Sequence, residues 1–430
     1  MPAPARNPWW IPRFLGRVPP EITPDQLRLV GAIALALLFE NYDLSMLGSA
    51  IKYIREDFGL PQSEVGRLTA LVRLGAIPAV FAIPFIDRLG RRRVFLAAVC
   101  GMSLGTLATA FVQSAWQFVA VQMVSRTFLL TASATAFVIV SEELPAARRG
   151  WGVGMLGALA AFGFGLGALL FAAIEHLPFG WRSLYAVGVV PLLLLPRFRR
   201  DVRETGRFER TRASAPAAGG PRKGWLAPVV GLVRDHPARA LGLALLGALA
   251  SGGYASGFQL MGDYLLTNRG WAPWEYSTLF ILGGLIGIVG NPAAGRFGDR
   301  FGRRAVGVAV LAAFPLFMGL FYRGDGWLIP AAWIPAVFAV SGGTTVIRAF
   351  STELFPTSSR GTATGWLMLL ETGGAALALA AVTGLTAPGE SVAFAVTLLS
   401  CLTLGAAVVV LFLPETANRE LEQISEDRAS

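Results

Sequence analysis

The sequence predicts an all-α membrane protein whose twelve spanning helices form two pseudo-symmetric six-helix bundles. Composition is the first reason, because 54% of the 430 residues are hydrophobic and 15% are charged, whereas a soluble domain averages roughly 25% charged. The second reason is that apolar residues come in blocks of about 18 to 25, long enough as helices to cross a ~30 Å hydrocarbon layer. The third is that two motifs of the first half recur in the second half.

The twelve expected spans set the domain organisation. We expect them at residues 29–53, 66–86, 93–113, 116–140, 151–174, 181–196, 239–262, 276–296, 304–322, 327–350, 361–385 and 391–413. They form a first bundle at 28–196 and a second at 238–413. The remaining parts are an N-terminal segment at 1–27, a linker at 197–237 and a tail at 414–430. The ASAPAAGGPRKG sequence of the linker predicts a flexible core.

Arginine is concentrated in alternate loops between the expected spans. The clusters lie at 91–93, 148–149, 197–212 and 300–304. Because positively charged loops stay in the cytoplasm, we expect both termini on that side and an even number of spans. The formal net charge of +10 therefore reports topology, and we expect the lipid bilayer, not nucleic acid, as the partner of this basic chain.

Two pairs of motifs indicate that the chain is an internal duplication. DRLGRR at 87–92 returns as DRFGRR at 299–304, an offset of 212 residues. EELPAARRG at 142–150 is similar to ELFPTSSRG at 353–361, an offset of 211 residues. Two independent motifs with nearly the same offset indicate two related halves, which is a recurring way to build transporters.

These motifs resemble those of the major facilitator superfamily, and most closely its sugar-porter and metabolite:proton symporter branches. GRFGDRFGRR at 295–304 matches the family's loop motif G-x-x-x-D-R-x-G-R-R, while the first copy has Ile83 at the glycine position. The EELPAARRG and ELFPTSSRG segments resemble the sugar-porter E-x-x-P-x-x-x-R-G element. LPETANRELEQI at 413–424 and RRDVRETGRFE at 199–209 resemble the elements that follow the last and the sixth spans. The resemblance implies a carrier that works by alternating access.

The charged residues of these motifs are expected to form a cytoplasmic latch. Carboxylates at helix ends would pair with guanidinium groups that follow tight glycine turns, linking the halves in one state and separating in the other. The alternative is that the arginines only anchor the topology. The expected latch residues are Asp87, Arg88, Arg91, Arg92, Glu142, Arg149, Asp299, Arg300, Arg303, Arg304, Glu353, Arg360 and Glu415.

Five charged residues that lie well away from the ends of expected spans have no charged counterpart in the other half. They are Glu40, Asp43, Arg73, Arg126 and Glu371, and the repeat offset carries each of them onto an uncharged residue. An ionised carboxylate at bilayer depth costs at least ~2.5 to 3.5 kcal/mol. Because residues that serve the common architecture should recur in both halves, these five are the candidates for function.

Asp43 and Arg126 both lie near the middle of their spans, the first and the fourth. The resemblance implies that the first, fourth, seventh and tenth helices line a central cavity, and that an acid on the first pairs with an arginine on the fourth. We therefore expect Asp43 to carry the proton and to release Arg126 when protonated. A permanently ionised structural pair is the alternative. Leu130 stands where the fourth-helix motif of the family has glycine.

The other intramembrane charges have open roles. Glu40, one turn before Asp43 on the same face, is either a second titrating group or an acceptor for substrate. Glu371 either faces the cavity or pairs with a neighbouring helix, and Arg348 is expected in a latch or interface. Arg73 either neutralises an acid or attracts an anionic substrate. The expected substrate-binding residues are Arg73, Tyr254, Gln259, Trp333, Ser341, Thr344 and Glu371.

The sequence favours proton-coupled symport, meaning uptake, of a small polar metabolite such as an organic acid or a sugar. We expect a monomer in a bacterial inner membrane, with no cofactor. We also expect no catalytic residue and no metal, because His176 and His236 have no matching ligand set. A drug or metabolite:proton antiporter is the alternative. The antiporter branch of the family carries a glycine-proline signature in the fifth span, and no proline occurs between Gly150 and Ile174 here. A non-transporting nutrient sensor is a further alternative.

Overall fold

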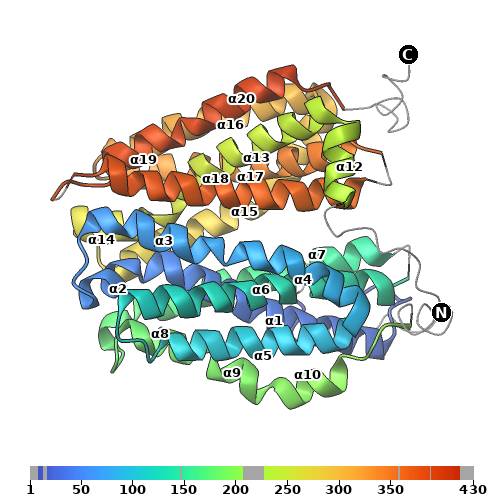
Figure 1. Cartoon of the computed structure of the whole chain (residues 1–430). Coiled ribbons are helices and arrows are strands. Elements are labelled where there is room, and N and C mark those ends of the chain that lie inside the picture. Colours follow the sequence, from blue (N-terminus) through green and yellow to red (C-terminus); the bar gives the residue numbers. More distant parts are fainter. Residues whose placement is uncertain are drawn as a thin grey trace. The chain divides into compact units, whose positions relative to one another are not determined.

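The computed structural model (Figure 1) describes residues 8–12, 17–145, 148–206, 227–356, 359–387 and 389–416. Side chains at 82–88, 227–228, 286–289 and 291–292 lie outside this description. Within the described ranges, every regular element is a helix. The expected flexible core of the linker, at 213–224, also lies outside the described residues.

The helices divide into two compact units. Unit 1 contains Met1–Leu47 and Gly75–Gly220, and unit 2 contains Gly48–Leu74 and Pro221–Ser430. The repeat in the sequence puts residues 48–74 in the first half, yet by their contacts they pack with the second half. The domain boundaries expected from the sequence remain a prediction.

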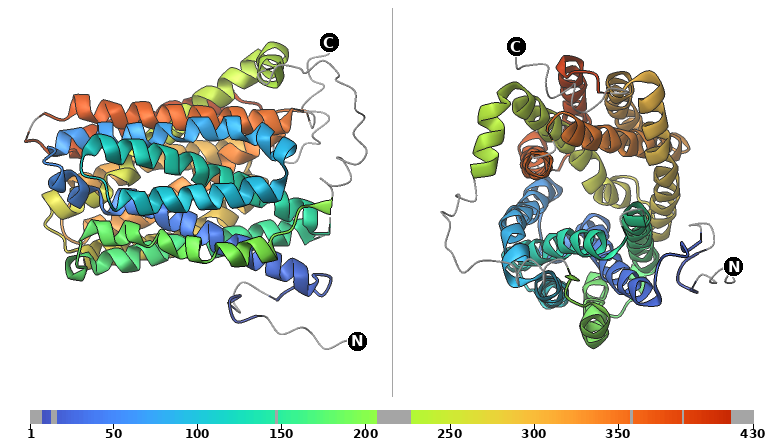
Figure 2. Two further views of the ribbon diagram at one scale, coloured as in Figure 1. Left: turned by 60° about the horizontal axis from the view of Figure 1, so that its bottom comes forward. Right: turned by 90° about the vertical axis from the view of Figure 1, so that its right-hand side faces the viewer.

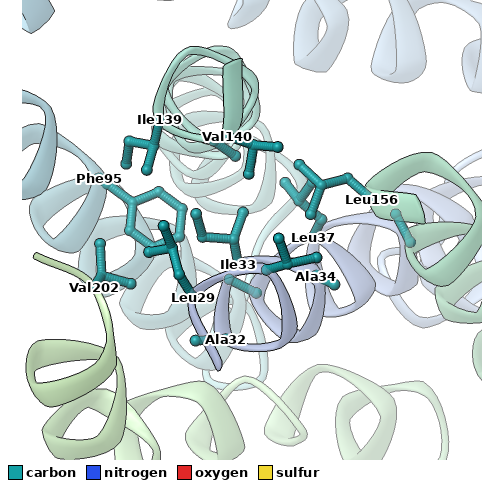
Figure 3. Close-up of a cluster of buried hydrophobic side chains, with 14 of the residues drawn as sticks. Leu29, Ala32, Ile33, Ala34, Leu37, Phe95, Ile139, Val140, Leu156 and Val202 are labelled. Carbon is teal, nitrogen blue, oxygen red and sulfur yellow. The ribbon is translucent and has the colours of Figure 1, made fainter. Parts of the chain in front are cut away.

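Unit 1 is built mainly from long helices. Its elements are α1 (Pro24–Ser49, whose last residues reach unit 2), α4 (Ala76–Leu89), α5 (Arg91–Thr109), α6 (Ala115–Glu143), α7 (Arg149–Ala172), η4 (Ile174–His176), α8 (Trp181–Ala186), α9 (Val189–Leu193) and α10 (Leu195–Asp201). Figure 2 shows α5 and α6 side by side along their length. Residues spaced four apart on α1, namely Leu29, Ile33 and Leu37, meet Phe95 of α5 and Leu156 of α7 in a buried core (Figure 3).

Unit 2 begins with a segment from the first half of the sequence. Its elements are α2 (Ile51–Asp57), η2 (Gln62–Glu64), α3 (Val65–Leu74), α12 (Ala227–Asp235), α13 (Pro237–Gln259), α14 (Met261–Asn268), α15 (Pro273–Phe301), α16 (Arg303–Arg323), α17 (Leu328–Glu353), α18 (Arg360–Leu385), α19 (Ala393–Ser400) and α20 (Leu402–Phe412). The most extensive packing is between α13 and α18, while α3 also packs on α18.

Each expected span coincides with one helix or with a broken helix. Eight of the described helices are long and apolar enough to cross a membrane: α1, α6, α7, α13 with α14, α16, α17, α18, and α19 with α20. The other four expected spans correspond to α3 with α4, α5, α8 with α9, and α15. The structure thus confirms the expected twelve-helix class, with the sixth span short.

The break between α3 and α4 falls at Gly75. A side chain there would put its Cβ 2.4 Å from the carbonyl oxygen of Met123 on α6, so only glycine allows this close approach. The hydroxyl of Thr127 on α6 lies 2.8 Å from the carbonyl oxygen of Gly75, to which it donates a hydrogen bond. The neighbouring helix therefore satisfies the backbone group that the break exposes.

A buried ion pair holds the start of unit 2 together. Arg55 of α2 donates from Nε to Oδ1 of Asp263 on α14 at 2.7 Å, and Gln62 donates to the other carboxylate oxygen. Asp263 is 0% exposed and Arg55 is 7% exposed. The pair connects the segment after the first span to the end of the seventh.

Candidate functional site

Two carboxylates of α1 lie inside unit 1. Glu40 and Asp43, one helical turn apart, are each only 5% exposed. Oδ1 of Asp43 accepts a hydrogen bond from the hydroxyl of Thr106 on α5 at 2.7 Å. Asp43 and Thr106 border a small cavity that is also lined by Phe39 and Gly188. The structure thus places the expected proton-carrying residue against a hydroxyl from another helix.

Arg126 of α6 is the positive charge of this cluster. It interacts electrostatically with both Asp43 and Glu40, and Ser133 of the same helix lies close to Glu40. In the described part of the chain, the buried Nε of Arg126 and Oε2 of Glu40 have no hydrogen-bond partner. Within these same residues, no direct ion pair joins Arg126 to either acid. The structure therefore brings the three charges together, while their direct pairing remains a prediction.

Thr106 is a residue that the sequence analysis missed. The repeat offset of 212 carries it onto Met318, so it is polar in one half and apolar in the other, like the five charged candidates. The same comparison would have found it if it had included hydroxyl side chains. The offset of 211 carries Ser133 of α6 onto Thr344, another hydroxyl residue, so this comparison would not have identified it.

The second cluster of charges lies in unit 2. Arg348 of α17 forms an ion pair with Glu371 of α18, with 2.8 Å between Nη2 and Oε2. Arg73 of α3 also interacts electrostatically with Glu371. Of the two roles left open for Glu371, the structure shows the pair with a neighbouring helix, and it gives Arg348 that partner.

The other expected substrate-binding residues have varied environments. Tyr254 of α13 is buried, its hydroxyl has no hydrogen-bond partner among the described residues, and a Cβ at Gly343 would lie 2.0 Å from that hydroxyl. Trp333 of α17 is 1% exposed and donates from Nε1 to the carbonyl oxygen of Leu279 at 3.1 Å. A substrate-binding role for Tyr254 and Trp333 remains a prediction. Gln259, Ser341 and Thr344 are partly buried.

Thr344 donates its hydroxyl to its own helix backbone, at 3.0 Å from the carbonyl oxygen of Val340. The carbonyl oxygen of Ser341 accepts hydrogen bonds from the hydroxyls of Thr344 and Thr345. Within unit 2, these contacts of Ser341 and Thr344 are made along one helix. A substrate-binding role for them remains a prediction.

The motif residues of unit 1 form a compact charge network. Arg91, at the start of α5, pairs through Nη2 with Glu142 at 3.2 Å, and Glu142 also accepts from the hydroxyl of Thr205 at 2.6 Å. Oε1 of Glu204 accepts the backbone N–H groups of Arg91 and Arg92 at 2.9 and 3.3 Å. This carboxylate therefore caps the positive end of the α5 dipole.

Unit 2 repeats the same network. Arg303, at the start of α16, pairs with Glu353 at 3.5 Å, and Glu353 accepts from the hydroxyl of Thr416. Glu415 accepts the backbone N–H groups of Arg303 and Arg304 at 2.8 and 3.1 Å. The glutamate–threonine pairs at 204–205 and 415–416 are again 211 residues apart, a third repeated element that the sequence analysis did not align.

The glycine turns expected beside the latch arginines are present. Gly90 and Gly302 both have φ of 96°, a conformation that only glycine adopts easily. Asp299 pairs with Arg303 at 2.8 Å. The ion pairs described for these motifs are internal to each unit, and the expectation that they link the two halves remains a prediction.

The remaining expected latch residues are Asp87, Arg88, Arg149, Arg300 and Arg360. The side chains of Asp87 and Arg88 lie outside the description, and Arg149 is the first residue of α7. The guanidinium of Arg300 lies 5.2 Å from the ring centre of Phe301. Arg360 donates from Nε to the carbonyl oxygen of Phe355 at 3.3 Å.

A duplicated chain of membrane helices that holds opposite charges at span depth is typical of an integral, multi-pass membrane transporter. The chain belongs to the Major Facilitator Superfamily, whose family model matches residues 33–322 and 243–429, and it is therefore a transporter and not an enzyme. This confirms the family that the motifs indicate.

Known proteins are similar to the chain over most of its length. A gallate transporter of Pseudomonas putida is 29% identical over 362 residues, which cover 78% of this chain and 80% of that protein. The cis,cis-muconate transport protein of Acinetobacter baylyi is 27% identical, covering 83% and 87%. The inward open structure of the xylose transporter XylE from E. coli matches with a TM-score of 0.75 and 17% identity, covering 93% and 99%. At that identity the structural match concerns the fold.

Proposed function

We propose that the protein is a proton-coupled symporter that takes up a small organic acid anion by alternating access. It would act as a monomer in a bacterial inner membrane. The observation that carries the proposal is the charge count in unit 1, where Glu40 and Asp43 lie buried near one arginine, Arg126. With both acids ionised, this cluster has one negative charge in excess, and one proton makes it neutral. An excess charge at bilayer depth is costly, so the cluster is suited to bind and release one proton.

The choice between a sugar and an acid rests on the relatives. Two proteins that match most of the chain are named for gallate and for cis,cis-muconate, and both compounds are carboxylates. The similarity to a xylose transporter concerns the fold only. We therefore favour a carboxylate attached to an aromatic ring or a conjugated chain as the substrate.

The coupling mechanism follows from the contacts of Asp43. In the ionised state its charge offsets that of Arg126 and it accepts from Thr106. A proton removes this charge and leaves Arg126 with Glu40 as its counter-charge. The rearrangement would favour the state that binds and carries substrate inward, and the proton would leave on the other side.

Transport by purified protein in proteoliposomes tests this proposal. With an acidic outer solution, the wild type should accumulate radiolabelled gallate or muconate, whereas Asp43→Asn should exchange substrate without accumulating it. Asp25→Asn, which removes an exposed acid in the first turn of α1, is the matched control and should behave as wild type. Accumulation by Asp43→Asn at the wild-type level would overturn the coupling assignment. Efflux driven by the same gradient would indicate the antiporter instead.

A further inference from the structure

The charged cluster of unit 2, formed by Arg73, Arg348 and Glu371, has a net charge opposite in sign to that of the Glu40, Asp43 and Arg126 cluster of unit 1. Arg73 and Arg348 both interact with a single acid, Glu371, and all three lie within expected spans. With all of them ionised, the cluster has one positive charge in excess. Because ionised groups at this depth need a counter-charge, the cluster is suited to bind one anion.

The three side chains come from three different helices, and the arginine and glutamate of the ion pair lie at different depths. Arg348 lies five residues before the end of α17, and Glu371 lies eleven residues after the start of α18. At 1.5 Å per residue these positions are about 8 and 17 Å from the loop that joins the two helices. Arg73 comes from α3, which packs against α18. Glu371 is therefore shared by arginines from two neighbouring helices.

The exposure of the ion pair shows which member is accessible. The side chain of Arg348 is 49% exposed, whereas that of Glu371 is 19% exposed. A guanidinium has five N–H donors, and a single hydrogen bond to Glu371 is described, from Nη2 at 2.8 Å. Arg348 thus keeps further N–H donors and exposed side-chain surface for a second carboxylate. An arginine can bind a carboxylate through two parallel hydrogen bonds.

We propose that Arg348 and Arg73 bind the carboxylate of the substrate, and that Glu371 is a resident carboxylate that neutralises one of the two arginines. The proposal rests on the proposed function, because it names the residues that recognise an acid substrate. It also gives a charge rule. Two arginines and one glutamate leave a net charge of +1, which matches a monocarboxylate.

The charge rule makes opposite predictions for the two kinds of variant. Arg348→Gln or Arg73→Gln brings the net charge to zero, and affinity for a monocarboxylate should fall about 10- to 100-fold, as for a lost hydrogen bond to a charged group. Glu371→Gln raises the net charge to +2, and the preference should move from the monocarboxylate towards a dicarboxylate. A gain for one ligand cannot result from misfolding.

Equilibrium binding to purified protein in detergent tests the rule, with 4-hydroxybenzoate, its uncharged amide 4-hydroxybenzamide and the dicarboxylate cis,cis-muconate as probes. The wild type should bind the benzoate more tightly than the amide, and Arg348→Gln should lose this discrimination. Arg348→Lys, which keeps the charge but not the two-pronged geometry, should restore part of it. Arg323→Gln, which removes an exposed arginine at the end of α16, should bind as wild type.

The outcomes separate this inference from the function on which it rests. If the wild type takes up carboxylates while the arginine variants keep wild-type affinity and Glu371→Gln keeps wild-type preference, the inference alone is overturned. If the wild type binds none of the carboxylates, both the inference and the proposed substrate class are overturned.

Discussion

The buried ion pair between Arg55 and Asp263 allows a quantitative test of how unit 2 holds the segment from the first half of the sequence. Replacing Asp263 by Asn leaves Arg55, which is 7% exposed, with only the half-exposed Glu56, 3.6 Å from its Nη2, as a described ion-pair partner. Removing one partner of a buried pair costs about 3 to 5 kcal/mol. The amide still accepts one hydrogen bond, so we expect a loss of about 3 kcal/mol in the free energy of unfolding.

The exposed pair of Arg269 and Asp325 provides the matched control. The Asp325 side chain is 81% exposed, and a surface ion pair contributes about 0 to 1 kcal/mol. Asp325→Asn is therefore the same chemical change with a much smaller expected effect. A third variant, Arg55→Met with Asp263→Leu, removes both charges and should recover most of the lost stability.

Chemical unfolding in detergent micelles, followed by tryptophan fluorescence, measures all three free energies. The reasoning is refuted if Asp263→Asn costs no more than Asp325→Asn. It is also refuted if the double variant is as unstable as the single one, because the loss would then not come from an uncompensated guanidinium.

Three further predictions concern helix packing, helix capping and the candidate proton site. Gly163→Ala should destabilise the protein by about 1 to 3 kcal/mol, because its Cβ would lie 2.0 Å from the carbonyl oxygen of Leu38. Gly165→Ala on the same helix would meet no atom within 4 Å, so it should be nearly neutral. Thermal unfolding measures both effects. Glu204→Gln and Glu415→Gln should each speed hydrogen exchange of the backbone amides that they accept at the start of α5 or α16, with the other helix unchanged. Thr106→Val should slow proton-driven uptake about tenfold or more, as expected for a hydrogen bond to a charged group, while Thr131→Val, whose hydroxyl donates to the carbonyl oxygen of Thr127 on its own helix, should not.

The spans and the duplication could be predicted from the sequence because hydropathy and repeats are properties of consecutive residues. Each expected span corresponds to a helix or a broken helix. The break at Gly75 could not be predicted, because the hydroxyl that accommodates it belongs to Thr127, 52 residues further on. Hydropathy also does not show that residues 48–74 pack with unit 2.

The candidate charges were predictable for a similar reason, and their partners were not. The cost of a charge inside a span singles out Asp43 and Glu371 wherever their side chains point. Their contacts with Thr106 and Arg348 depend on how the helices are rotated about their axes. Arg55 and Asp263 were missed because charges near span ends are common, so the penalty that identified the deeper acids does not identify them.

The charges of the two clusters together predict that uptake is electroneutral for a monocarboxylate. The unit 1 cluster has a net charge of −1 and takes one proton, while the unit 2 cluster has a net charge of +1 and takes one monovalent anion. A proton and a monocarboxylate then cross together with no net charge. In proteoliposomes with a potassium diffusion potential set by valinomycin, the rate of 4-hydroxybenzoate uptake should not change with voltage. A dicarboxylate carries one uncompensated negative charge, so a negative interior should slow its uptake. Voltage-driven uptake of the monocarboxylate would contradict this stoichiometry, because it would require a second proton.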